Sequence, residues 1–395
     1  MMAILSVAVF IFLIAAGLFG TQEYPLANIL PAFVWIAWWV GLGFVCALVG
    51  NVWPALNPWA AVPALFPGVP RDRDGRPVPS WMGVWPAVFL YLCFAWAELV
   101  WPNNPAPASL ASAILVYSAV TWAGMALYGI EPWLRCGEPF SIVFGLFGRF
   151  APLARTARGQ LVLRHYGSGL ADGEKVPVSM VVLVVTLLAT VSFDGFLHTP
   201  VWAGFYATAS HGLYDLGWTH FLGNTGARTL IFTTGLVLAP LSFVALFLGT
   251  CALMARLANR GEGTRRGAMD LASSYVLTLV PIAIAYHLAH YLLLLIFEGQ
   301  RLFGHISDPF GVGWDLFGTA GVTPDPTVVG ARFLWLFSLF VIVAGHAIAV
   351  WLAHRAAYRE NEGGAVVAPQ LPMLVLMVGY TIFSLWIIGQ PIVEV

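Results

Sequence analysis

Two histidines lie three positions apart inside a long apolar segment of this 395-residue chain. His287 and His290 occur in YHLAHYLLLLIFEGQ, a segment that also contains Glu298. With about 3.6 residues per helical turn, side chains three positions apart lie on the same side of a helix. Because polar side chains that face lipid tails are costly, we expect both imidazoles to face the interior of a helical bundle.

Two imidazoles on one helix can bind a single metal ion when neighbouring helices supply further ligands. Asp194 in SFDGF and His346 in GHAIAV are the side chains that could complete such a set. We therefore interpret His287, His290, Asp194 and His346 as candidate ligands of a divalent metal ion, with Zn, Fe and Cu all compatible. The alternative is that these side chains hydrogen-bond between helices as packing groups, the more frequent role of a single buried histidine such as His346.

Asp194 and Glu298 are the candidate catalytic residues. A carboxylate in an apolar environment is either protonated or paired with a cation or metal. We expect Asp194 to act as a metal ligand or general base, with Glu298 as the other group that could accept a proton. The alternative for Asp194 is a structural role, in which it accepts hydrogen bonds at the end of a membrane span.

The composition is that of an integral membrane protein. Hydrophobic residues make up 59% of the chain and charged residues 9%, and the mean hydropathy is +0.82. Soluble proteins have about a quarter of their residues charged. The lipid bilayer is therefore the expected partner, and other membrane subunits could bind there. A net charge of -1, without a basic cluster interleaved with aromatics, gives no indication of a nucleic-acid partner.

The hydrophobic segments predict an all-α polytopic helical bundle, which we interpret as a single transmembrane domain over residues 1–395. About nine spans are expected, at residues 2–19, 29–50, 83–101, 110–129, 177–197, 230–253, 270–301, 332–354 and 371–388. The first lacks the basic residues that precede a signal peptide's apolar core, so we expect an uncleaved helix.

Proline-rich segments follow the second and fourth spans and indicate interfacial positions. Both contain a glycine, a leucine and then an Asn-Pro or Glu-Pro pair in the same order: Gly50, Leu56 and Asn57-Pro58 in the first, and Gly129, Leu134 and Glu138-Pro139 in the second. Residues 1–68 and 83–152 are therefore interpreted as a weak repeat, with chance similarity as the alternative.

The basic residues predict the orientation. Fifteen of the 18 Lys and Arg residues lie in the loops after the second, fourth, sixth and eighth spans, and three lie in the alternate loops. The positive-inside rule then places the N-terminus in the cytoplasm and the C-terminus outside. Residues 199–229 and 299–331 become external loops, which we expect to be structured.

Several segments resemble a family of polytopic bacterial membrane proteins known as fenitrothion hydrolases. These segments are GNVWPALNPW, SFDGF, YHLAHYLLLLIFEGQ, SDPFGVGWDLFGTAG and GHAIAVWLAHRAA, and the similarity extends across most of the chain. The resemblance implies a membrane phosphotriester (organophosphorus) hydrolase but assigns no catalytic residues. In such an enzyme, a bound metal ion would activate water and polarise the phosphoryl oxygen.

Two other classes of function fit the sequence. One is a copper- or iron-handling protein or an electron-transfer subunit. The other is a small-solute or proton-coupled transporter, with Asp194, Glu98 and Glu298 as a relay and with Pro240 and Pro281 interrupting helices around the pathway. The chain contains no P-loop, GxSxG or HExxH motif, so it carries no sign of the nucleotide, serine-hydrolase or zincin chemistry of those motifs.

Overall fold

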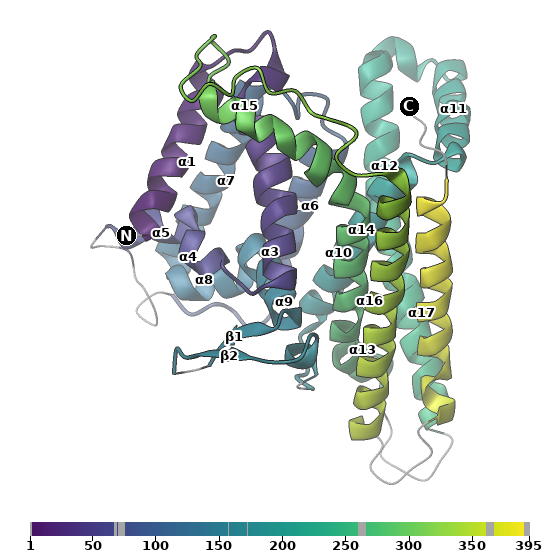
Figure 1. Cartoon of the computed structure of the whole chain (residues 1–395). Helices are drawn as coiled ribbons and strands as arrows, with labels where there is room; N and C mark the ends of the chain where they lie inside the picture. The colour runs from purple at the N-terminus through teal and green to yellow at the C-terminus, as the bar shows by residue number, and fades with distance from the viewer. Residues whose placement is uncertain are drawn as a thin grey trace. The chain divides into compact units, whose positions relative to one another are not determined.

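Helices make up most of the chain in the computed structural model (Figure 1). The structure describes residues 2–390, apart from 67, 68, 70–75, 157, 172, 260–265 and 361–366. Its described strands form one antiparallel hairpin of β1 (Leu153–Arg155) and β2 (Leu161–Leu163). The protein is thus an all-α polytopic bundle, as its sequence predicts. Among the basic residues used for the orientation, Arg71, Arg73, Arg260 and Arg265 lie outside the described residues.

The chain divides into two compact units. Unit 1 comprises Met1–Cys93, Pro102–Arg164 and Tyr291–Trp335, and unit 2 comprises Phe94–Trp101, His165–His290 and Leu336–Val395. The interpretation of residues 1–395 as a single transmembrane domain stays a prediction.

Unit 1 is built from short and long helices. They are α1 (Met2–Phe19), α2 (Ile29–Ala32), a π-helical segment η2 (Phe33–Gly41), α3 (Leu42–Leu48), α4 (Trp53–Leu56), α5 (Pro58–Ala64), most of α6 (Trp85–Leu99), α7 (Pro107–Tyr128), α8 (Ile130–Cys136), α9 (Pro139–Phe150) and α15 (Arg301–Ser307). Helix α1 packs along α7, and α3 packs against α9.

Two short helices of unit 1 begin in the same way. Asn57 caps α5 by accepting hydrogen bonds from two backbone N–H groups of its first turn, and Glu138 caps α9 likewise. A proline follows each cap, where its missing N–H costs nothing. These caps belong to the Asn-Pro and Glu-Pro pairs of the weak repeat over residues 1–68 and 83–152. The repeat and the interfacial location of these segments stay predictions.

Unit 2 contains the long helices that hold the candidate site. They are α10 (Val178–Leu197), α11 (Pro200–Asp215), α12 (Trp218–Ala258), α13 (Ala268–Tyr275), α14 (Val280–Phe297, as far as His290), α16 (Ala331–Glu360, from Leu336) and α17 (Val367–Ile388). Helix α10 is buried along nearly its whole length, and α12 packs against α10, α13 and α17.

The seventh expected span is not one continuous α-helix. A 3₁₀ segment, η4 (Val276–Leu279), separates α13 from α14, and Pro281 follows directly. Proline has no backbone N–H, and its ring clashes with the carbonyl four residues earlier. The chain tightens into a 3₁₀ turn at that point, and such turns within a helix often mark hinges.

Eight described helices are long and apolar enough to cross a membrane. The sequence predicts about nine, because residues 83–101 are apolar almost throughout. Helix α6 covers only 15 of those residues, whereas a span needs about 20. The expected external loop at 199–229 contains α11 and the start of α12, which changes direction at Gly223. The loop at 299–331 contains α15 and a series of turns.

Gly345 permits a close approach of α16 to α14. A Cβ atom at this position would lie 2.3 Å from Ala285 Cβ and 2.8 Å from the Pro281 carbonyl oxygen. Both distances are shorter than van der Waals contact, so the helices touch along a backbone strip that only glycine leaves open.

We predict that Gly345→Ala destabilises the protein by about 1–3 kcal/mol, because the added methyl group forces the two helices apart. Thermal unfolding of the detergent-purified protein measures the change. Gly379→Ala on α17 is the matched control, since a Cβ atom there would have no neighbour within 4 Å. A Gly345→Ala protein as stable as the control variant would contradict the close approach.

Candidate functional site

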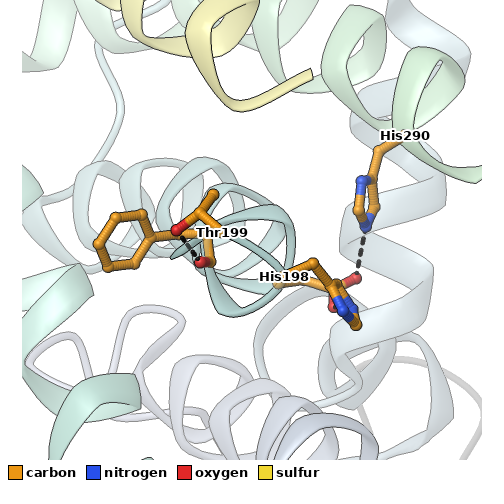
Figure 2. A network of polar contacts seen from close by, with 5 residues as sticks. His198, Thr199 and His290 are labelled. Atoms are coloured by element: carbon orange, nitrogen blue, oxygen red, sulfur yellow. Dashed lines mark hydrogen bonds and ion pairs between the residues drawn. The ribbon is translucent and has the colours of Figure 1, made fainter. Parts of the chain in front are cut away.

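The candidate site is centred on a hydrogen bond between α10 and α14. Asp194 Oδ2 lies 3.0 Å from His290 Nε2, and the two side chains are 12% and 20% exposed. His198 approaches the same carboxylate, with Nε2 3.9 Å from Asp194 Oδ1, but half of its side chain is exposed. Figure 2 shows His290 and His198 converging from two helices. We call Asp194 and His290 the Asp–His pair.

Gly195 explains why α10 can present Asp194 to α14. A Cβ atom on Gly195 would lie 2.1 Å from Tyr286 Oη, so the tyrosine hydroxyl rests against the glycine backbone. Tyr286 lies one turn before His290, and its ring stacks on the imidazole with centroids 5.8 Å apart. The SFDGF and YHLAHY segments therefore fit together: glycine receives the tyrosine while the preceding aspartate binds the histidine.

The end of α10 is fixed by its own sequence. Thr199 Oγ1 donates a hydrogen bond to the Phe196 carbonyl at 2.8 Å and accepts one from Trp202 N–H at 3.3 Å (Figure 2). Pro200 then starts α11 at the position where proline is best tolerated. This turn keeps Asp194 one helical turn from the end of its helix.

His346 contributes a second polar group inside unit 2. Its Nδ1 atom lies 2.7 Å from the Ile342 carbonyl oxygen, and its ring stacks on Tyr380 with centroids 5.8 Å apart. Tyr380 in turn hydrogen-bonds Ser192 of α10 through their hydroxyl groups. His346 is thus connected through Tyr380 to the same helix that carries Asp194.

His287 and His290, the two imidazoles of the expected metal site, lie on α14. His287 is buried, at 1% exposure, and lies about 60° around α14 from His290. Among the described residues, no three His, Cys, Asp or Glu side chains are grouped so that they could hold a metal ion. Metal binding by His287, His290, Asp194 and His346 therefore stays a prediction.

Glu298 lies in unit 1, where its carboxylate pairs with Arg301. Both side chains are more than a third exposed, and exposed ion pairs contribute only about 0–1 kcal/mol. Its catalytic role stays a prediction. Glu98 belongs to the part of α6 assigned to unit 2, where it is partly buried.

The SDPFGVGWDLFGTAG segment has a structural role in unit 1. Asp308 accepts hydrogen bonds from Val312 N–H and Gly313 N–H, and Ser307 Oγ accepts from Phe317 N–H and Thr319 N–H. Further along, hydrogen bonds from Thr327 hold the pKa of Asp325 below its usual value. Asp308 therefore stabilises a turn within this segment.

Tyr286, Ser192 and Tyr380 complete the site, and sequence reasoning did not single them out. The sequence could have indicated Tyr286, because it lies four positions before His290 and therefore on the same helix face. Ser192 and Tyr380 had none, since their contact depends on the packing of α17 against α10.

The arrangement can bind and release protons. Oδ2 and Nε2 at hydrogen-bond distance need one proton between them, because two bare acceptors would repel each other. A second proton converts a carboxylate with neutral imidazole into a carboxylate with imidazolium, in which the two charges compensate each other.

No family model, curated protein or solved structure matches the chain. The resemblance to fenitrothion hydrolases therefore remains an expectation based on the segments quoted above.

We predict that His290→Phe lowers the free energy of unfolding by about 1.5–3 kcal/mol, the usual contribution of a hydrogen bond to a charged group. Phenylalanine keeps the stacking on Tyr286 but removes Nε2. His198→Phe is the control and should cost less than about 1 kcal/mol, because its contact with Asp194 is long and exposed. Chemical or thermal unfolding in detergent measures both, and equal effects would refute the assigned hydrogen bond.

Proposed function

We propose that this protein is a proton-coupled transporter of a small solute in a bacterial cytoplasmic membrane, with the Asp–His pair as its proton-binding group. The supporting observation is a direct carboxylate–imidazole hydrogen bond, largely buried within a unit of apolar helices. Ionisable residues within membrane helices are rare and commonly belong to ion pathways or proton relays.

The chemistry of the pair suits this role. An isolated charge in hydrocarbon costs several kcal/mol, which is why a membrane protein seldom keeps a carboxylate there without a partner. Asp194 and His290 can gain and lose a proton while keeping one proton between their facing atoms. Proton exchange therefore changes the charge of the pair without breaking its hydrogen bond.

Interrupted helices next to the pair support transport over a fixed structural role. The 3₁₀ segment Val276–Leu279 and Pro281 break the helix that carries His290, and Pro240 lies inside α12. Transporters place binding groups at such breaks, where unwound backbone can change conformation.

The proposed orientation follows from the basic residues and has the N-terminus in the cytoplasm and the C-terminus outside. Helices α10 and α14 then run outward, and Asp194 lies near the outer end of α10. A proton would reach the pair from the outer side of the membrane.

We predict that Asp194→Asn reduces proton flux into proteoliposomes by about tenfold or more, because an amide carries no negative charge to compensate the imidazolium that forms when His290 binds a proton. The full-length protein is reconstituted with an entrapped pH-sensitive dye, and a potassium diffusion potential drives proton entry. Asp215→Asn, the same change at an exposed position on α11, should retain the flux. Wild-type flux no greater than that of protein-free vesicles would contradict the transport proposal.

The second candidate is the metal-dependent phosphotriester hydrolase implied by the sequence resemblance. One observation favours it: a carboxylate bound to one imidazole nitrogen, as Asp194 is to His290, commonly orients a histidine toward a metal. Elemental analysis of detergent-purified protein separates the two candidates. A stoichiometric metal that is lost in His290→Ala would favour the hydrolase or a copper- or iron-handling protein, whereas metal-free protein with proton flux favours the transporter.

A further inference from the structure

His346 presents an unused basic nitrogen inside unit 2. Its Nδ1 atom faces the Ile342 carbonyl oxygen, which can only accept, so Nδ1 must carry the hydrogen. In the neutral ring, Nε2 is then a hydrogen-bond acceptor. The residue is 6% exposed, and Nε2 is buried with no hydrogen-bond partner among the described residues. Leaving a buried polar group without a partner is destabilising.

Tyr286 presents the complementary group. Its hydroxyl oxygen is buried and has no hydrogen-bond partner among the described residues, and the residue is 1% exposed. The hydroxyl rests against the Gly195 backbone, next to Asp194. A tyrosine hydroxyl both donates and accepts, so it can satisfy an acceptor such as His346 Nε2 directly or through water.

The two side chains lie on the same side of the contact between α14 and α16. Gly345 meets Ala285 and Pro281, whereas Ser338 hydrogen-bonds the Ala289 carbonyl, so the helices are antiparallel. Each of the two residues directly follows a contact position, Tyr286 after Ala285 and His346 after Gly345. Both helices are right-handed and run in opposite directions. The residue that follows the contact position therefore points toward the same side of the contact in each helix.

The positions of Tyr286 and His346 along their helices also fit a path for protons. The Gly345 contact places His346 near the level of residue 282 on α14, about 12 Å below His290 at 1.5 Å per residue. Tyr286 lies about halfway along α14 between His290 and the level of residue 282. Ser192 and Tyr380 border the same region, because they join α10 to α17 and Tyr380 stacks on His346.

We propose that Tyr286 and His346 hold buried water between them, and that this water extends the proton path from the Asp–His pair toward the cytoplasmic half of unit 2. Buried polar groups that lack a protein partner are normally satisfied by ordered water. The water site stands on the two atoms alone, whereas its role as a path rests on the proposed transport function.

Proton movement through this site needs no other reactant. In a hydrogen-bonded chain, an oxygen atom binds a proton on one side. It then releases a different proton on its other side. Tyr286 can accept on its oxygen lone pair and donate its own proton to the water. Tyr286 and the water therefore return to their neutral forms after the proton has passed, while His346 Nε2 accepts a hydrogen bond that holds the water in place.

The water site can be tested in the full-length protein in lipid bilayers. Solid-state NMR with ¹⁵N-labelled histidine measures magnetisation transfer from water to each imidazole, and His346→Gln identifies the signal of His346. We expect transfer to His346 in the wild type and at least a twofold loss in Tyr286→Phe. Tyr214→Phe, the same change at an exposed position, should leave transfer unchanged. No transfer to the wild-type His346 signal would overturn the water site.

The same variants separate the path from the transport function. If water carries the proton onward, Tyr286→Phe lowers flux in proteoliposomes by about tenfold while Tyr214→Phe retains it. Wild-type flux in Tyr286→Phe, together with loss of flux in Asp194→Asn, would overturn the path but not the transporter. Absence of flux in the wild type would overturn the proposed function, and the NMR transfer would still decide the water site.

Discussion

The hydrogen bond between Asp194 and His290 is the interaction on which the organisation of unit 2 depends. It places a carboxylate and an imidazole where apolar side chains surround them, which is favourable only while each satisfies the other. The stacked ring of Tyr286 and the packing of its hydroxyl on Gly195 hold the pair in place. Removing either partner would take this hydrogen bond away from a largely buried polar group.

Two glycines make this arrangement sterically accessible. Gly195 brings α10 to Tyr286, and Gly345 brings α16 to Pro281 and Ala285. Small residues let membrane helices approach closely, so that packing and interhelical hydrogen bonds replace the missing hydrophobic driving force. At Gly195 the α10 backbone contacts the Tyr286 hydroxyl, and at Gly345 the α16 backbone contacts the Pro281 carbonyl and the Ala285 methyl group.

Unit 1 contains a buried carboxylate with a different role, that of Glu138. Glu138 is fully buried, yet its carboxylate accepts from Tyr117, from two backbone N–H groups and from Ser141. Around it, rings of Trp38, Trp59 and Phe140 pack with centroids 4.5–6.4 Å apart. This carboxylate caps a helix and is hydrogen-bonded. Among the described residues of unit 2, Tyr286 Oη and His346 Nε2 are buried without a hydrogen-bond partner.

The sequence by itself determined the all-α membrane class, most of the apolar spans and the shared helix face of His287 and His290. These features depend on hydropathy and on the helical repeat, which are local properties of the chain. The number of spans predicted from the sequence exceeds the number of described helices long enough to cross a membrane, because α6 is shorter than the apolar segment 83–101.

Only the tertiary structure decided which side chains meet. The sequence grouped Asp194 with both histidines of α14, and the structure gives the hydrogen bond to His290. It also connects His346 to Tyr380 and Ser192, for which no local pattern existed. Contacts between helices depend on backbone approach at Gly195 and Gly345, and an approach of this kind is set by packing among residues that lie far apart in the chain.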